Sequence, residues 1–227
     1  MVPIYFLGPY GEERGVRIAD INGDGLEDMI KASYEMSSGE VYLNKGDGTG
    51  WAFNSNYYVP VDFTDKYNDD NGSRIADING DGLADLIRSN GNVNEVYMNN
   101  AAGTGWNINN DYWIPLDFTK PGSAIADVNN DGLSDILFSQ ANSSQAVYIN
   151  TGKNWELDSN YYIPVNFATK EGGDNGVRME DANGDGLLDL FYARDDDWTN
   201  RKVYINKGNG FGWFENNQYN IPQPFIF

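Results

Sequence analysis

Short runs of β-branched and aromatic residues alternate along the chain with clusters of Gly, Asn, Asp and Pro. Val16 to Asp20 is one such run, Met29-Ile30 begins a second, and Val41 to Asn44 forms a third. These residue types favour the pleated, half-buried surface of a sheet, and the clusters between them favour turns. The hydrophobic pattern therefore predicts an all-β protein made of short strands.

The same strand signals occur four times, and each set ends in a long fourth strand that contains a Trp. Such a period indicates a repeat architecture, and four strands per repeat is the size of a propeller blade. We predict a single β-propeller domain over residues 1–227 with four four-stranded blades. The predicted repeats are 2–58, 59–113, 114–162 and 163–220, followed by a strand stub at 221–227.

Each predicted fourth strand runs from its Trp to the next Pro-x-x-Phe sequence. Because Pro cannot donate to a strand ladder, this strand is predicted to be the outer edge of its blade. The Pro-x-x-Phe ending occurs five times although the blade signals occur four times. We expect a closed ring of four blades, in preference to an arc of a larger ring or a ring completed by two chains. The spare outer strand would allow self-association by strand exchange.

The loop between the first and second strands of every repeat reads DxNxDGxxD. It places oxygen-bearing side chains at loop positions 1, 3, 5 and 9 and Gly at position 6, where the chain can turn sharply. Three converging carboxylates repel one another by about 4 kcal/mol per pair at an effective dielectric constant of ~20. A central cation would offset this repulsion, and Ca²⁺ suits oxygen donors in a flexible geometry better than Mg²⁺ or Zn²⁺.

We therefore expect four Ca²⁺ ions, one in each loop. The ligands in a loop would be the side chains at positions 1, 3, 5 and 9 and the backbone carbonyl at position 7. The candidate metal residues are Asp20, Asn22, Asp24, Leu26, Asp28, Asp77, Asn79, Asp81, Leu83, Asp85, Asp127, Asn129, Asp131, Leu133, Asp135, Asp181, Asn183, Asp185, Leu187 and Asp189.

The loops could also be tight turns without a metal, or EF-hands. Asn-Gly and Asp-Gly also favour tight turns, but a bare turn does not require Asp at positions 1, 5 and 9 of all four copies. An EF-hand requires Glu at position 12 and flanking helices. Position 12 is Lys31, Arg88, Phe138 or Tyr192, which excludes the EF-hand.

The composition limits the classes of partner and the kinds of chemistry that are open to the chain. Cys and His are absent, which removes disulfides, thiol chemistry and the commonest general base. The net charge of −19 argues against nucleic acid and anionic membranes as partners. No apolar run approaches the roughly 20 residues of a membrane span. Met1-Val2-Pro3 leads directly into repeat sequence, so we expect that a leader was removed or that none exists.

Calcium sites of modest affinity are occupied outside cells, where free Ca²⁺ is abundant enough for dissociation constants of about 10⁻⁴ to 10⁻³ M. We therefore expect an extracellular or cell-surface protein. The repeated Trp and Tyr residues are interpreted as packing between blades rather than as platforms for sugars, because they recur at fixed positions of the repeat. Arg17, Arg74 and Arg178 recur on the first strand, and we expect them to pair with nearby carboxylates.

The DxNxDGxxD loops, followed by third strands of the form Val-Tyr-x-Asn, make the chain resemble the FG-GAP/VCBS family of Ca²⁺-binding propeller repeats. That family includes integrin α head domains, fungal lectins and the propellers of Rhs and Tc-type toxins, and residues 51–63 are most similar to toxin-type repeats. The resemblance implies Ca²⁺ in the hairpin between the first two strands of each blade. The chain departs from the family in having four blades rather than the common seven, and in having Asn130 where other copies have Gly. Asn tolerates a left-handed conformation, so we expect the third site to persist.

The predicted function is a noncatalytic, lectin-like binding module that presents a loop face to a glycan or a protein. The variable loops lie on the face opposite the metal hairpins. Trp198 could stack on a sugar while nearby carboxylates accept its hydroxyl groups, or the same loop could be a solvated charged segment. The candidate ligand-binding residues are Tyr34, Tyr67, Arg194, Asp196 and Trp198.

Two other functions stay open. The chain could be a structural or assembly segment of a larger surface protein or toxin. It could also be a glycan-cleaving enzyme, since two carboxyl groups about 5 to 10 Å apart suffice for that reaction. We expect no enzyme, because nothing in the sequence pairs two carboxylates outside the metal loops.

Overall fold

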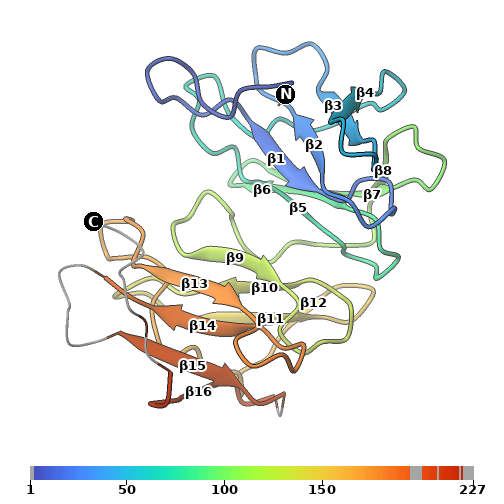
Figure 1. Ribbon diagram of the computed structural model, residues 1–227. Coiled ribbons are helices and arrows are strands. Elements are labelled where there is room, and N and C mark those ends of the chain that lie inside the picture. The colour runs from blue at the N-terminus through green and yellow to red at the C-terminus, as the bar shows by residue number, and fades with distance from the viewer. Residues whose placement is uncertain (1–2, 195–200, 209, 220, 222–227) are drawn as a thin grey trace. The chain divides into compact units, whose positions relative to one another are not determined.

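The computed structural model describes residues 3–194, 201–208, 210–219 and 221. The described residues form sixteen strands in four four-stranded antiparallel sheets and contain no helix (Figure 1). In this part of the chain, accordingly, no helix could cross a membrane. The chain is an all-β, four-bladed β-propeller, as the sequence predicts.

Each sheet is one blade, and its strands are hydrogen-bonded in sequence order. Blade 1 contains β1 (Val16–Ala19), β2 (Asp28–Lys31), β3 (Glu40–Asn44) and β4 (Trp51–Phe53). Blade 2 contains β5 (Ser73–Ala76), β6 (Asp85–Asn90), β7 (Val93–Asn99) and β8 (Trp106–Asn109). Blade 3 contains β9 (Ser123–Ala126), β10 (Asp135–Phe138), β11 (Ala146–Asn150) and β12 (Trp155–Leu157). Blade 4 contains β13 (Val177–Glu180), β14 (Asp189–Tyr192), β15 (Lys202–Asn206) and β16 (Trp213–Glu215).

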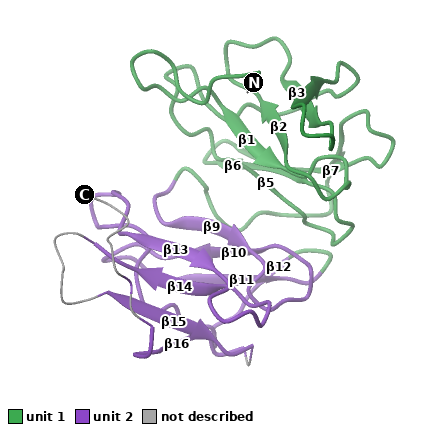
Figure 2. Cartoon of the chain, viewed as in Figure 1, with its two compact units in different colours: residues 1–119, 152–154 green, residues 120–151, 155–227 purple. Residues whose placement is uncertain are grey.

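The chain divides into two compact units (Figure 2). Unit 1 comprises Met1–Thr119 with Gly152–Asn154 and holds blades 1 and 2. Unit 2 comprises Lys120–Thr151 with Trp155–Phe227 and holds blades 3 and 4. The single domain over residues 1–227 stays a prediction.

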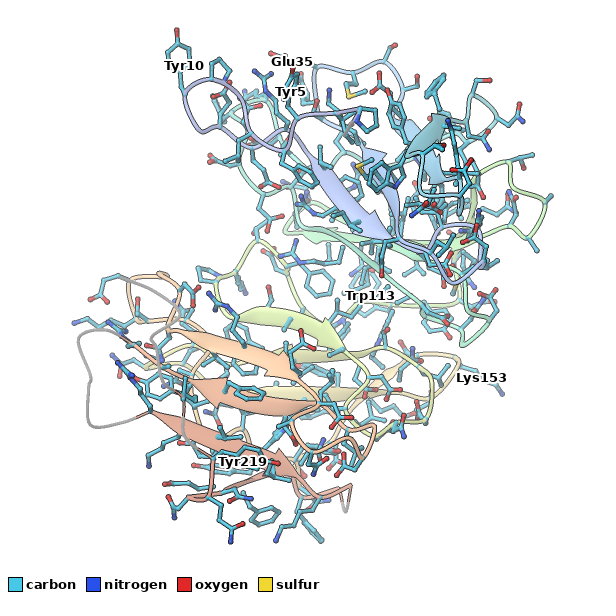
Figure 3. All side chains as sticks on the ribbon, in the orientation of Figure 1. Tyr5, Tyr10, Glu35, Trp113, Lys153 and Tyr219 are labelled. Carbon is cyan, nitrogen blue, oxygen red and sulfur yellow. The ribbon has the colours of Figure 1, made fainter. Side chains whose placement is uncertain are left out.

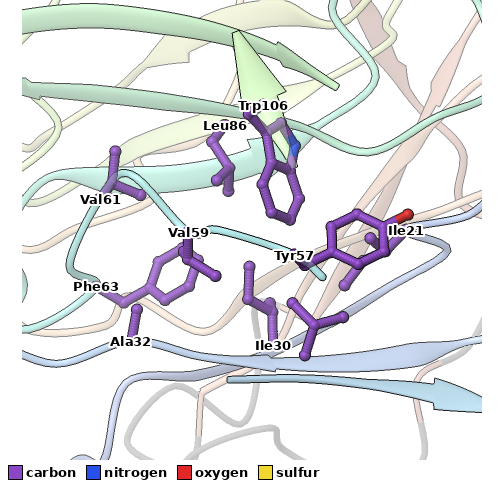
Figure 4. Packing of buried hydrophobic residues seen from close by; sticks show 10 residues of the cluster. Ile21, Ile30, Ala32, Tyr57, Val59, Val61, Phe63, Leu86 and Trp106 are labelled. Carbon is purple, nitrogen blue, oxygen red and sulfur yellow. The ribbon is translucent and has the colours of Figure 1, made fainter. Parts of the chain in front are cut away.

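The core of unit 1 lies where blade 1 meets blade 2. Tyr57 and Trp106 have ring centroids 5.5 Å apart, and Figure 4 shows both rings close to the aliphatic side chains of the cluster. This confirms the prediction that the repeated aromatic residues pack between blades. The buried cluster consists of Ile21, Ile30, Ala32, Val41, Tyr57, Val59, Val61, Phe63, Leu86 and Trp106.

Unit 2 repeats this arrangement between blades 3 and 4. Tyr161 and Trp213 have ring centroids 5.7 Å apart, and both side chains are buried. Val128 and Leu137 of blade 3 belong to the same cluster as Leu190 of blade 4. The equivalent positions of the repeat therefore build the same junction in both units.

The fourth strands are shorter than predicted. β4 ends at Phe53, and the Pro-x-x-Phe segment from Pro60 to Phe63 is not part of it. Instead the Phe63 side chain is fully buried in the junction core, and its N–H group donates to the carbonyl of Ala32 just after β2. The fourth strand is an edge strand of each sheet, but Pro60, Pro115 and Pro164 lie outside it, and Pro222 is not among the described residues.

A side-chain turn ends each fourth strand early. The N–H group of Asn56 donates to the Asn54 side chain at 3.0 Å, and the N–H group of Asp111 donates to the Asn109 side chain at 2.8 Å. Such Asx turns redirect the chain away from the sheet edge. The first Pro-x-x-Phe segment is not the predicted outer strand over its described residues 3–6, because its Ile4 is buried with Val16 and Met29 instead of extending an edge. Of the predicted stub at 221–227, residues 222–227 lie outside the described residues. Self-association by strand exchange stays a prediction.

The recurring arginines of the first strands are paired as predicted. Arg17 pairs with Glu13, Arg74 with Asp70 at 2.8 Å, and Arg178 with Asp174 at 2.9 Å. The first two guanidinium groups also lie over rings of the Pro-x-x-Phe segments, at 5.0 Å from the Phe63 centroid and 5.3 Å from the Phe118 centroid. These two arginines therefore tie each linking segment to the first strand of the blade that precedes it.

Candidate metal loops and the loop face of unit 1

The four DxNxDGxxD loops are the turns of the hairpins between the first and second strands. In the first loop, β1 ends at Ala19 and the ninth loop residue, Asp28, is its partner across the hairpin. Gly23 and Gly25 have φ of 77° and 81°, which a side chain rarely allows. Asn130 takes the place of Gly in the third loop with φ of 59°, which confirms that Asn accommodates this conformation.

The first Asp of each loop accepts hydrogen bonds from the loop backbone. Asp20 Oδ1 accepts from the N–H group of Gly23 at 2.8 Å, and its Oδ2 accepts from Gly25 at 2.7 Å. Asn22 Oδ1 accepts from the N–H group of Asp24 at 2.9 Å. The same bond from the sixth-position Gly is made to Asp77, Asp127 and Asp181.

The ninth residue of each loop is a fully buried carboxylate. Asp28 Oδ2 accepts from the N–H group of Ile21 at 3.1 Å, and its Oδ1 accepts from Asn44 at 2.7 Å. Burial raises the pKa of Asp85 and of Asp135 to about 7, although such backbone hydrogen bonds oppose the shift and the other loop carboxylates reinforce it. The pKa values of the equivalent carboxyl groups, Asp28 and Asp189, are raised for the same reasons.

These loops offer a donor set that fits calcium. Each supplies three carboxylates, one amide oxygen and one backbone carbonyl, and Ca²⁺ prefers such oxygen ligands. The ninth carboxylate of the second loop accepts hydrogen bonds from the N–H groups of Ile78 and Asn99, and its burial raises the pKa of Asp85. Within the described ranges, however, no three acidic side chains already converge as a metal cage, because the carboxylate oxygens face backbone N–H groups.

Two repeated contacts near the loops were not anticipated from the sequence. The indole N–H of Trp106 donates to the carbonyl of Ala84, the eighth residue of the second loop, at 2.7 Å, and Trp51, Trp155 and Trp213 make the equivalent bond. The Asn that ends each third strand donates its backbone N–H to the buried ninth carboxylate. Their signal in the sequence was their recurrence at one position of every repeat.

The opposite end of blade 1 carries exposed aromatic residues on neighbouring loops. Tyr34 and Tyr67 are 60% and 70% exposed. Their loops are joined because Ser33 and Thr64 form a β-bridge and the N–H group of Tyr34 donates to the carbonyl of Thr64 at 3.3 Å. The structure therefore places these two predicted ligand residues on adjacent loops.

The predicted site residues of blade 4 are only partly described. Arg194 donates to the Asn175 side chain at 2.6 Å, so at least part of its role is to hold the neighbouring loop. Asp196 and Trp198 lie outside the described residues. Their proposed contact with a sugar is therefore untested.

A cavity of about 680 Å³ opens beside the N-terminal segment of unit 1. Its wall includes Tyr5 and Tyr42 together with the charged side chains of Arg14, Lys31 and Glu40. Tyr5 is 84% exposed, and Figure 3 shows it at the same end of unit 1 as Tyr10 and Glu35. Because Lys31 ends β2 and Glu40 begins β3, this cavity lies at the blade end opposite the metal loop.

The comparisons with known proteins identify the repeat. The family model described as FG-GAP-like repeat matches residues 20–87, 77–138 and 127–192. No curated protein sequence shows significant similarity to the chain.

Two solved structures share the fold. A lectin of Agrocybe aegerita, which recognises non-reducing terminal N-acetylglucosamine, matches with a TM-score of 0.60 and 22% identity over 87% of this chain and 49% of the lectin. The Tc holotoxin pore of Photorhabdus luminescens matches with a TM-score of 0.58 and 21% identity over 93% of this chain and 9% of the toxin chain. The present chain thus spans about half the length of the lectin and a small part of the toxin.

Proposed function

Because the chain belongs to the FG-GAP-like repeat family, we propose that it is a noncatalytic, calcium-stabilised propeller module that binds a glycan or a protein. The observation that carries the calcium part is the identical loop in all four blades. Each copy has the same oxygen donors, the same backbone hydrogen bonds and a buried ninth carboxylate. That carboxylate accepts two backbone hydrogen bonds in every copy, and a bound cation would in addition offset the charge that burial removes from water.

Calcium would be held by the side chains at positions 1, 3, 5 and 9 and by the carbonyl at position 7. When bound, the cation would supply the positive charge that offsets the loop carboxylates. The protein's own residues shape the loop. The glycines turn the chain, and the asparagine that ends each third strand donates its backbone N–H to the ninth carboxylate and so orients it. Since folding gathers the ligands, calcium binding would add directly to the free energy of folding.

The ligand would meet the loop face of unit 1. Tyr34 and Tyr67 expose their rings on adjacent loops. The cavity beside Tyr5 adds the positively charged side chains of Arg14 and Lys31 and the carboxylate of Glu40. Aromatic faces stack on sugar rings and apolar side chains, while charged groups orient a polar ligand. An extracellular or cell-surface location would supply the calcium such loops require. The sugar recognised by the Agrocybe aegerita lectin makes glycans the first class to test.

Thermal unfolding with and without chelator tests the calcium proposal. The melting temperature is expected to fall by many degrees in EGTA and to recover with Ca²⁺ but not with Mg²⁺, because Mg²⁺ demands a strict octahedron. An identical melting curve in chelator would exclude calcium as part of the fold. A glycan array probed in both conditions then tests the ligand.

A second candidate function is an assembly segment of a larger protein. The observation in its favour is that the chain matches 9% of the toxin chain and 49% of the lectin chain, as one part of a longer array would. Sedimentation of the pure protein separates the two. An assembly segment is expected to associate with itself and to give no signal on the array, whereas a binding module gives a glycan or protein signal as a monomer.

A further inference from the structure

Asn99, the last residue of β7, connects the metal loops of blades 1 and 2. Its backbone N–H donates to the Asp85 carboxylate, the ninth position of the second loop, at 2.6 Å. Its side-chain amide donates to the carbonyl of Ile21 at 2.7 Å. Ile21 stands between Asp20 and Asn22, two proposed ligands of the first loop. One 7% exposed residue thus bonds to both loops.

Unit 2 contains the same connection. The backbone N–H of Asn206 donates to the Asp189 carboxylate of the fourth loop at 2.8 Å. Its side-chain amide donates to the carbonyl of Val128 at 2.7 Å, and Val128 stands between Asp127 and Asn129 of the third loop. The recurrence in two units with different local sequences argues that the connection belongs to the architecture.

The paired loops also touch directly. The N–H group of Ala84 in the second loop donates to the carbonyl of Asp20 in the first at 3.2 Å. A Cβ atom on Gly23 would lie 2.8 Å from the Leu83 side chain, and one on Gly186 would lie 3.0 Å from the Asn130 side chain. In each unit, therefore, the two loops lie in close contact.

We propose that the two metal loops of each unit bind calcium as a coupled pair, with Asn99 and Asn206 as the positioning residues that couple them. The proposal rests on the proposed calcium binding. Calcium in the second loop would order Asp85 and hence Asn99, whose amide then holds the Ile21 peptide of the first loop in place. The second ion would find its loop already ordered, which is positive cooperativity.

Repulsion between the two bound cations acts in the opposite sense. Salt screens exposed charges over about 8 Å at physiological ionic strength, whereas a buried hydrogen bond is screened much less. A titration at that ionic strength therefore weakens the repulsion more than it weakens the bonded connection.

The test is an equilibrium calcium titration of the full chain, comparing the wild type with Asn99→Ala, Asn206→Ala and the double variant. The wild type is expected to bind with a Hill coefficient above 1, and the double variant with one close to 1. Asn44→Ala is the matched control, because Asn44 makes the same bond to its own ninth carboxylate while its amide bonds to Glu27 within blade 1. It should keep the wild-type cooperativity.

Each outcome decides one claim. Binding with a Hill coefficient of 1 or less in the wild type would overturn the coupling and leave the calcium proposal standing, whereas no binding at all would overturn the calcium proposal. A purely structural role for Asn99 would lower the melting temperature and leave the Hill coefficient unchanged.

A second variant covers the case in which the double variant fails to fold. Asp81→Ala removes one ligand of the second loop, and coupling predicts that one of the three intact loops also loses affinity by at least about fivefold. Three equal remaining sites would overturn the coupling.

Discussion

Ala101 stands in the second blade at a position where the loop after the third strand has Gly in the other blades. Gly46 and Gly208, at the equivalent position, have φ of 67° and 62° and donate their N–H groups to the preceding Asn side chains. Ala101 does not take a positive φ, because its Cβ disfavours that conformation. In the described part of the protein, the buried Oδ1 of Asn99 consequently accepts no hydrogen bond.

Ala101→Gly is therefore expected to stabilise the protein, against the usual effect of Gly. Satisfying a buried acceptor is worth about 1 to 3 kcal/mol, and the added chain entropy of Gly costs about 0.5 to 1 kcal/mol. The free energy of unfolding in urea should rise by about 1 kcal/mol. Ala102→Gly, which restores no acceptor, is the control and should lower it. Equal losses in both variants would refute this account of Asn99.

The fifth loop position should matter for stability only when calcium is present. Asp24 and Glu27 are both exposed acidic residues of the first loop, but only Asp24 is a proposed ligand. With calcium at 100 times its dissociation constant, losing one site costs about 2.7 kcal/mol. Asp24→Ala should show a loss of that order by urea unfolding in calcium and little change in EGTA. Glu27→Ala should stay within about 0.5 kcal/mol in both conditions, and equal effects would argue against metal ligation.

At the scale of elements, the Pro-x-x-Phe segments that begin at Pro60, Pro115 and Pro164 link consecutive blades. Phe118 and Phe167 donate their N–H groups to the carbonyls of Ser89 and Ser139, both at 2.9 Å, as Phe63 does to Ala32. Each linker thereby bonds to a carbonyl at or just after the end of a second strand, and Phe63 and Phe167 belong to or pack against the junction cores. This position explains why Phe63 and Phe118 are almost fully buried although prolines precede them.

A pair of Phe variants distinguishes the linker from an outer strand. Phe63→Ala removes a fully buried ring and should cost about 3 to 5 kcal/mol in the free energy of unfolding. Phe53→Ala removes a ring of the edge strand β4 that is 58% exposed and lies against Tyr42, so the loss should be about 1 kcal/mol. Similar losses for the two variants would mean that the linker is not part of the core.

At the scale of the whole molecule, blade 1 shows the separation most clearly, because its DxNxDGxxD loop and the exposed ring of Tyr34 lie at opposite ends of the blade. In blade 1 the first hairpin carries the proposed calcium ligands, and the connection after β2 carries Tyr34. An end that bound calcium would make rigid, together with an exposed loop end, suits a module that holds a binding surface in a constant shape.

The double variant Tyr34→Ala, Tyr67→Ala tests the loop face. Both side chains are largely exposed, so the melting temperature should change little, whereas binding to a ligand found on the array should fall at least tenfold. Tyr58→Ala is the control, because the Tyr58 side chain is similarly exposed, at 62%, but lies elsewhere. Its N–H group donates to the carbonyl of Thr104 rather than to the loop of Tyr34 or Tyr67. Unchanged binding in the double variant would move the ligand site away from this face.

The sequence by itself determined the features that depend on local spacing. The strand signals, the four copies of the loop and the left-handed Gly or Asn positions all follow from residues close together in the chain. For the same reason the Arg–carboxylate pairs could be predicted, since the two partners of each pair stand four positions apart in the sequence.

Only the tertiary structure decided what the repeated residues touch across blades. Whether Pro60 to Phe63 extends an edge or enters the core depends on Ala32 and Leu86, and the Asn99 side chain meets Ile21 from 78 residues away. A repeat pattern records that such residues recur but not which neighbour they meet. That choice is made when two blades bury their apolar faces against each other, because every buried amide and carbonyl at the junction then needs a partner.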